Sequence, residues 1–91
     1  MFDMLTRAEL HELHGTLCHQ YGRQHRIIMG LMDLDRAAPD GGDIAGLLAS
    51  PAFRVLDASH REVDEMADEV YAELRSRDAE AEVLRELTRD A

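Results

Sequence analysis

Hydrophobic residues recur every three or four positions along two long stretches of the chain, the spacing that places side chains on one face of an α-helix. In the first stretch they are Leu10, Leu13, Leu17, Ile27, Leu31 and Leu34. The second stretch runs with the same spacing from Phe53 to Leu84 and is interrupted by the polar residues His60 and Arg77. No stretch alternates with the period of two that is typical of a half-buried strand. The pattern predicts an all-α fold.

Capping residues divide the chain into its predicted elements. Thr6 and Glu9 have the spacing of a capping box, and Asp43 precedes a short apolar segment. Ser50 followed by Pro51 is typical of a helix start, because proline fits the first helical position. We expect a helix over 6–35, a turn over 36–43, a short helix over 44–49 and a helix over 51–89, with a kink near 76–78 as an alternative.

These elements predict a single helical domain over residues 1–91, built as a long antiparallel hairpin with a short intervening helix. We expect the hairpin to close along its whole length, with Val83, Leu84 and Leu87 beside Phe2 and Met4.

The second half of the first helix is apolar over an arc of roughly 220° at 100° per residue, wider than one neighbouring helix covers. The residues of this arc are Ile27, Ile28, Met29, Leu31, Met32 and Leu34. We expect the short helix to cover part of the arc and a second copy of the chain to cover the rest. The resulting homodimer is a four-helix bundle, since two-fold pairing is the commonest assembly. A monomeric three-helix bundle is the alternative.

A polar segment, residues 18–26, separates the two apolar parts of the first helix. In an antiparallel hairpin, the numbers of facing residues sum to about 86, which places His25 within one turn of His60. Three hypotheses remain open. The segment forms a buried or half-buried polar layer that fixes register, the helix breaks at Gly22 and exposes the segment, or His25 and His60 bind a ligand.

Four residues are candidate ligands for zinc or another transition metal: His25, His60, Cys18 and His14. His14 and Cys18 are four residues apart, so their side chains project from the same side of a helix. Structural zinc takes four ligands, and this helix offers at most three close together. The alternative is a solvated face that carries surface histidines and an incidental cysteine.

The chain is acidic, with 19 Asp and Glu against 10 Arg and no Lys, and a net charge of −9. This charge argues against nucleic acid or an anionic membrane as a partner, because both are bound through excess basic residues. Acidic side chains concentrate on the last predicted helix, where Glu65, Glu69 and Glu73 share a face. A solvated face explains them, and so does a docking surface for a basic protein or a surface that mimics nucleic acid. One cysteine and no apolar run long enough for a membrane span favour a cytoplasmic protein.

No nucleophile beside a base and no phosphate-binding glycine loop is present in the sequence, so we do not expect an enzyme. We expect a small acidic protein-interaction module, an adaptor, inhibitor, antitoxin-like regulator or assembly subunit. Its apolar face lies on the first helix and its acidic face on the last. The alternative is a bundle that binds a metal or cofactor through histidines in a central polar layer.

Overall fold

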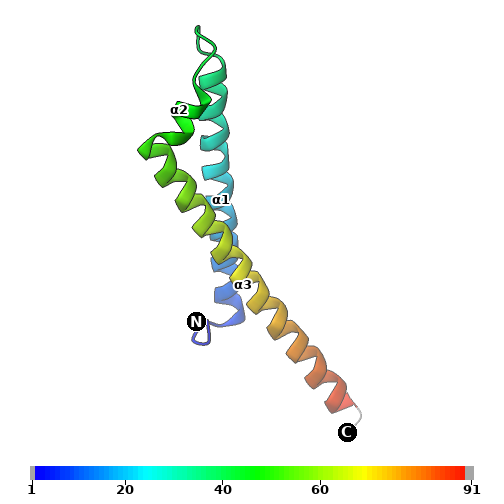
Figure 1. Ribbon diagram of the computed structural model, residues 1–91. Helices are drawn as coiled ribbons and strands as arrows, with labels where there is room; N and C mark the ends of the chain where they lie inside the picture. The colour runs from blue at the N-terminus through cyan, green and yellow to red at the C-terminus, as the bar shows by residue number, and fades with distance from the viewer. Residues whose placement is uncertain (1, 90–91) are drawn as a thin grey trace.

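The computed structural model describes residues 2–89, and in this part of the chain it contains three helices and no strand. They are α1 (Arg7–Arg36), α2 (Ile44–Ala49) and α3 (Pro51–Arg89). Helices α1 and α3 run antiparallel and cross at an angle, and α2 bridges the end at which α1 finishes and α3 begins (Figure 1). For the described residues, the all-α prediction is therefore confirmed. The four-helix bundle remains a prediction.

A complete capping box starts α1. The Thr6 hydroxyl accepts a hydrogen bond from the Glu9 backbone N–H (3.1 Å), and the Glu9 carboxylate accepts one from the Thr6 backbone N–H (3.0 Å). These two bonds occupy amides that have no partner within the helix. Hydrogen bonding to Thr6 lowers the pKa of Glu9. The larger contribution comes from the Thr6 backbone and the smaller one from the Thr6 side chain. The carboxylate therefore stays charged, and the cap intact, to a lower pH than an unbonded glutamate would allow.

The connection between α1 and α3 depends on two glycines and two caps. Gly41 and Gly42 have φ angles of 85° and 79°, a region that side-chain-bearing residues rarely adopt. Asp43 caps α2 by accepting from the Gly46 N–H (3.0 Å). The Ser50 hydroxyl accepts from the Phe53 N–H (3.3 Å) at the start of α3. Each of these signals is local, and α2 and α3 begin at the predicted residues.

Neither long helix is interrupted. The backbone of α1 is helical through Gly22, so the hypothesis of a break there is wrong. Likewise α3 is one helix through residues 76–78, and the alternative of a kink or restart at that point is wrong (Figure 1). A glycine in a helix costs about 1 kcal/mol relative to alanine. Packing against the facing helix over many turns outweighs a penalty of this size.

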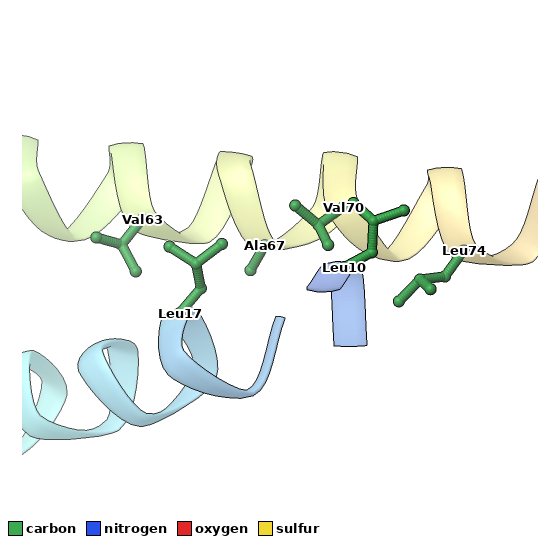
Figure 2. Packing of buried hydrophobic residues seen from close by; sticks show 6 residues of the cluster. All are labelled: Leu10, Leu17, Val63, Ala67, Val70 and Leu74. Atoms are coloured by element: carbon green, nitrogen blue, oxygen red, sulfur yellow. The ribbon is translucent and has the colours of Figure 1, made fainter. Parts of the chain in front are cut away.

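The buried core is one row of apolar side chains between α1 and α3. Its members are Leu10, Leu17, Val63, Ala67, Val70 and Leu74. Figure 2 shows Leu17 directed toward α3 beside Val63 and Ala67, and Leu10 beside Val70. Leu10 and Val70 are fully inaccessible to solvent. The main core therefore occupies the stretch where the helices cross, and Phe53 in the first turn of α3 is buried outside this row.

The last part of α3 continues beyond α1. Arg7, at the start of α1, is ion-paired with Asp78 (2.9 Å), and residues 79–89, which we call the α3 tail, project past this point (Figure 1). The expectation that the hairpin closes along its whole length is therefore wrong. The reason is that residues 2–5 form a turn, in which the Leu5 N–H donates to the Phe2 carbonyl (3.0 Å), instead of extending along the tail.

The molecule is elongated, with extents of 73 × 21 × 18 Å and a radius of gyration of 20.1 Å. A compact domain of 91 residues has a radius of gyration of about 12 Å. Its accessible surface is 6973 Å², whereas a compact monomer of 10.3 kDa exposes about 5,400 Å². One chain by itself thus exposes roughly 1,600 Å² more than a compact fold of its size.

Candidate functional site

Polar side chains from both long helices meet at one level of the hairpin. Gln24 of α1 donates through Nε2 to the Ser59 hydroxyl of α3 (3.0 Å), and its Oε1 lies 3.3 Å from Nδ1 of His60. The ring of Tyr21 stacks on His60 with centroids 4.1 Å apart, and the ring of His25 lies 6.0 Å from that of His60. We call these five residues the polar layer. The predicted meeting of His25 and His60 at one level is confirmed.

The geometry fits a layer that fixes register. Gln24, Ser59 and His60 are half-buried, and Gln24 bonds both of the others. No buried side-chain polar atom lacks a hydrogen-bond partner within residues 2–89. Sliding α3 by one residue along α1 would break these hydrogen bonds between the two helices.

The candidate metal ligands lie in two pairs. Cys18 Sγ is 3.6 Å from His14 Nε2 on the exposed side of α1, and His25 and His60 belong to the polar layer. Over the described range, no three His, Cys, Asp or Glu side chains come close enough together to hold one metal ion. One chain therefore offers at most two ligands at either pair, fewer than the four of a structural zinc site.

The predicted apolar face lies at the loop end, by which we mean the last turns of α1, helix α2 and the first turns of α3. Ile27, Met29 and Leu34 are exposed, with Leu34 73% accessible, and the remaining members Ile28, Leu31 and Met32 are half-buried. On α2, Ile44 and Leu48 are exposed as well. Helix α2 thus covers only part of the apolar arc, and a broad apolar surface remains.

A second apolar surface lies on the α3 tail. Val83, Leu84 and Leu87 are 56%, 62% and 67% accessible. Val83 and Leu84 line a shallow surface depression of about 510 Å³ with Ser76 and Ala79. Sequence reasoning placed these residues inside the hairpin. The lengths of the two helices indicate that this placement is wrong. A first helix of 30 residues cannot cover a last helix of 39 residues along its whole length.

The acidic residues of α3 differ in their surroundings. Glu65 and Glu69 are exposed on one face of the helix, together with Glu62. Glu73 is half-buried and accepts a hydrogen bond from Nε of Arg77 (3.0 Å). Its charge is therefore neutralised within the chain, and the acidic face available to a partner comprises Glu62, Glu65 and Glu69.

Arg77 has a role that the sequence pattern did not indicate. Besides Glu73, its guanidinium donates to the backbone carbonyls of Leu5 (2.6 Å) and Phe2 (2.9 Å). The residue that interrupts the hydrophobic pattern of α3 thus binds the turn before α1. Its partners lie more than 70 positions away in the sequence, so no local signal could identify them.

The surface of residues 2–89 carries shallow depressions, each lined by residues of one helix or by charged side chains at the helix crossing. None of the described helices is both long and apolar enough to cross a membrane. Comparison with protein-family models, curated proteins and solved structures finds no match to this chain.

Proposed function

We propose that this chain is a small acidic protein-interaction module. It binds other proteins through the apolar surfaces outside its core and through the acidic face on α3. The observation that carries the proposal is the surface of the single chain, roughly 1,600 Å² more than that of a compact monomer. A standard interface removes about 800 Å² from each partner, so the excess is large enough for binding another protein.

The distribution of the apolar side chains supports the same proposal. Isolated exposed apolar residues are ordinary, but contiguous patches mark sites of interaction. Ile27 and Leu34 are exposed on α1 and Ile44 and Leu48 on α2, and these two helices contact each other at the loop end. A protein partner that covers them gains about 25 cal/mol per Å² of apolar area buried.

The acidic face selects the charge of a further partner. Glu62, Glu65 and Glu69 lie on successive turns of α3, and no ion pair engages them within the described residues. Such a face attracts a basic protein and repels acidic ones, which speeds correct association and discourages wrong partners.

We expect the double substitution Glu65→Arg with Glu69→Arg to weaken binding of a basic partner at least about tenfold at low salt, because both charges that steer association are reversed. Immobilised chain is used to capture proteins from an extract of the source cells, and the captured partner is then titrated against each variant. The matched control is Asp64→Arg with Asp68→Arg, which changes the net charge equally on a neighbouring face of the same helix. Equal loss in both variants, or no loss in either, contradicts a role for the acidic face.

A second candidate function is the binding of a transition metal by the polar layer. His25 and His60 have ring centroids 6.0 Å apart, close enough for one ion to contact both imidazoles after small ring rotations. A two-fold dimer in which these layers meet would supply four imidazoles to one site.

For this candidate we expect the untagged protein, purified without chelator, to retain metal in stoichiometric amount. We expect His60→Ala to abolish retention, because it removes half of the imidazole ligands from the site. Native mass spectrometry detects the bound ion directly. His19→Ala, which removes an exposed histidine outside the polar layer, is the control and should change nothing. Protein that carries no metal, or whose metal survives His60→Ala, contradicts this function.

A further inference from the structure

Most of the large exposed apolar residues lie toward the two ends of the elongated molecule, with Tyr21, Met66 and Tyr71 between them. Ile27, Leu34 and Leu48 lie at the loop end, whereas Leu84 and Leu87 lie on the α3 tail. Figure 1 shows these two regions at the far ends of the structure, with the helix crossing between them. Neither surface can cover the other within one chain, because the long axis of the molecule measures 73 Å.

The two ends also differ in charge. Residues 22–56, which include the loop end, carry four arginines against four aspartates and have no net charge. Residues 78–89 of α3 carry four acidic residues against two arginines. Arg23 and Arg26 are exposed and form no ion pair within residues 2–89, so they are available to acidic groups of another molecule.

We propose that a second copy of this chain binds antiparallel to the first, so that each α3 tail packs on the loop end of the other copy. This inference rests on the proposed function and names one partner for its apolar surfaces. The two-fold symmetry uses both ends of both chains, which closes the assembly as a dimer.

Register follows from pairing the apolar residues. In an antiparallel dimer, the tail of one chain runs parallel to α1 of the other, so the offset between facing residues is constant. Placing Leu84 beside the exposed Ile27 sets this offset and brings Leu87 within about one turn of the exposed Leu34. The same offset puts Glu80, which forms no ion pair within residues 2–89, within about one turn of Arg23 and Arg26. Apolar contact and charge complementarity therefore favour the same alignment.

A parallel dimer lacks both advantages. It places each α3 tail beside the α3 tail of the second chain, away from the loop end. It also brings Glu62, Glu65 and Glu69 to the level of the same residues of the second chain, and these like charges repel one another. Each chain also has enough surface to form the antiparallel interface. Its surface exceeds that of a compact monomer by roughly 1,600 Å², about twice the 800 Å² that a standard interface buries on each partner.

Disulfide trapping tests the orientation. In a Cys18→Ser background, one preparation carries Ile27→Cys and another carries Leu84→Cys, and the two are mixed and equilibrated in a glutathione redox buffer. We expect the mixed disulfide to exceed either self-linked product at least about tenfold, because the thiol–disulfide equilibrium follows proximity. Mass spectrometry distinguishes the three products. Glu12→Cys is the matched control for Ile27→Cys, since it is exposed near the other end of α1 and should form no mixed product.

Each other outcome overturns the inference in a defined way. Self-linked Leu84→Cys as the main product means a parallel dimer. No disulfide, together with a mass of 10.3 kDa for the unmodified chain in sedimentation equilibrium, means that a second copy is not the partner. The second result would not contradict the proposed function. The capture experiment with the Glu65 and Glu69 variants tests that function separately, because it does not depend on self-association.

A tail variant provides independent evidence. Leu84→Arg with Leu87→Arg should raise the dimer dissociation constant at least about tenfold, because both apolar contacts are lost and two charges are introduced into the interface. The helix content measured by circular dichroism should remain unchanged, since neither side chain belongs to the core of the hairpin. An unchanged dissociation constant contradicts the proposed contact.

Discussion

Replacing Leu10 by alanine should destabilise this protein more than any other single truncation on α1. Leu10 is fully buried and packs in the row that includes Val70 and Leu74 of α3. Removing a buried leucine side chain costs about 2–5 kcal/mol, through lost apolar burial and the cavity left behind. A chain of this length has a total stability of about 5–14 kcal/mol. We therefore expect the melting temperature, followed by circular dichroism at 222 nm, to fall by at least about 10 °C.

Met4→Ala is the matched control for this prediction. The side chain of Met4 is 94% accessible, so its removal takes little apolar surface out of a buried environment. We expect a change of less than about 0.5 kcal/mol in the free energy of unfolding. Similar losses for Leu10→Ala and Met4→Ala would contradict a core located at the helix crossing.

Replacing Arg77 by alanine should also destabilise the protein strongly. Its guanidinium donates to the carbonyls of Leu5 and Phe2 and to the Glu73 carboxylate, and the side chain is half-buried. Hydrogen bonds to charged groups contribute about 1.5–3 kcal/mol. We expect the free energy of unfolding to fall by about 2–3 kcal/mol. Backbone amides of residues 2–6 should also exchange with deuterium faster, since the turn before α1 loses its attachment to α3.

Two variants separate this role from a general effect of charge. Arg75→Ala removes a neighbouring arginine that is exposed and lies 5.9 Å from the ring of Tyr71, so we expect a change of less than about 1 kcal/mol. Arg77→Lys keeps the charge but not the planar group that bonds two carbonyls at once, and it should restore only part of the stability. Full stability in Arg77→Lys would show that the hydrogen-bond geometry at this position has no importance.

The helices could be predicted from the sequence because their signals are local. The capping box at Thr6 and Glu9, the Asp43 cap and the Ser50–Pro51 start each act within a few residues, and the structure contains all of them. The apolar spacing of α3 likewise identified Val63, Ala67, Val70 and Leu74 as core residues. The same spacing continues to Leu84, which is exposed, so periodicity identifies the apolar face and the reach of α1 decides which residues on that face are buried.

Features that depend on how the helices cross could not be predicted in the same way. Counting from the turn brought His25 to His60 in the polar layer, because an error of a few residues still leaves them on adjacent turns. The same counting placed Leu84 inside the hairpin, which is wrong, since residues 2–5 turn back toward Arg77. In the sequence, Arg77 only interrupts the apolar spacing of α3, and its role could not be predicted for a related reason. Its contacts join the two ends of the chain, and no short-range pattern encodes them.

The candidate site also combines features that the sequence predicts with features that depend on how the helices pack. The apolar character of Ile27 and Leu34 could be recognised from the sequence, and their exposure depends on how little of α1 the six residues of α2 cover. Glu73 differs from Glu65 and Glu69 by a local signal, because Arg77 follows it by four residues, the spacing that favours an ion pair on a helix.

The central claim is that the chain has an open, elongated fold with apolar surfaces for other proteins at its ends. Small-angle X-ray scattering of the purified chain tests this claim most directly. We expect a radius of gyration of at least about 20 Å, as in the structure, with a forward intensity that corresponds to two chains. A radius of about 12 Å with the intensity of one chain would contradict it. That result would mean that the α3 tail folds back and that no surplus surface is left for a partner.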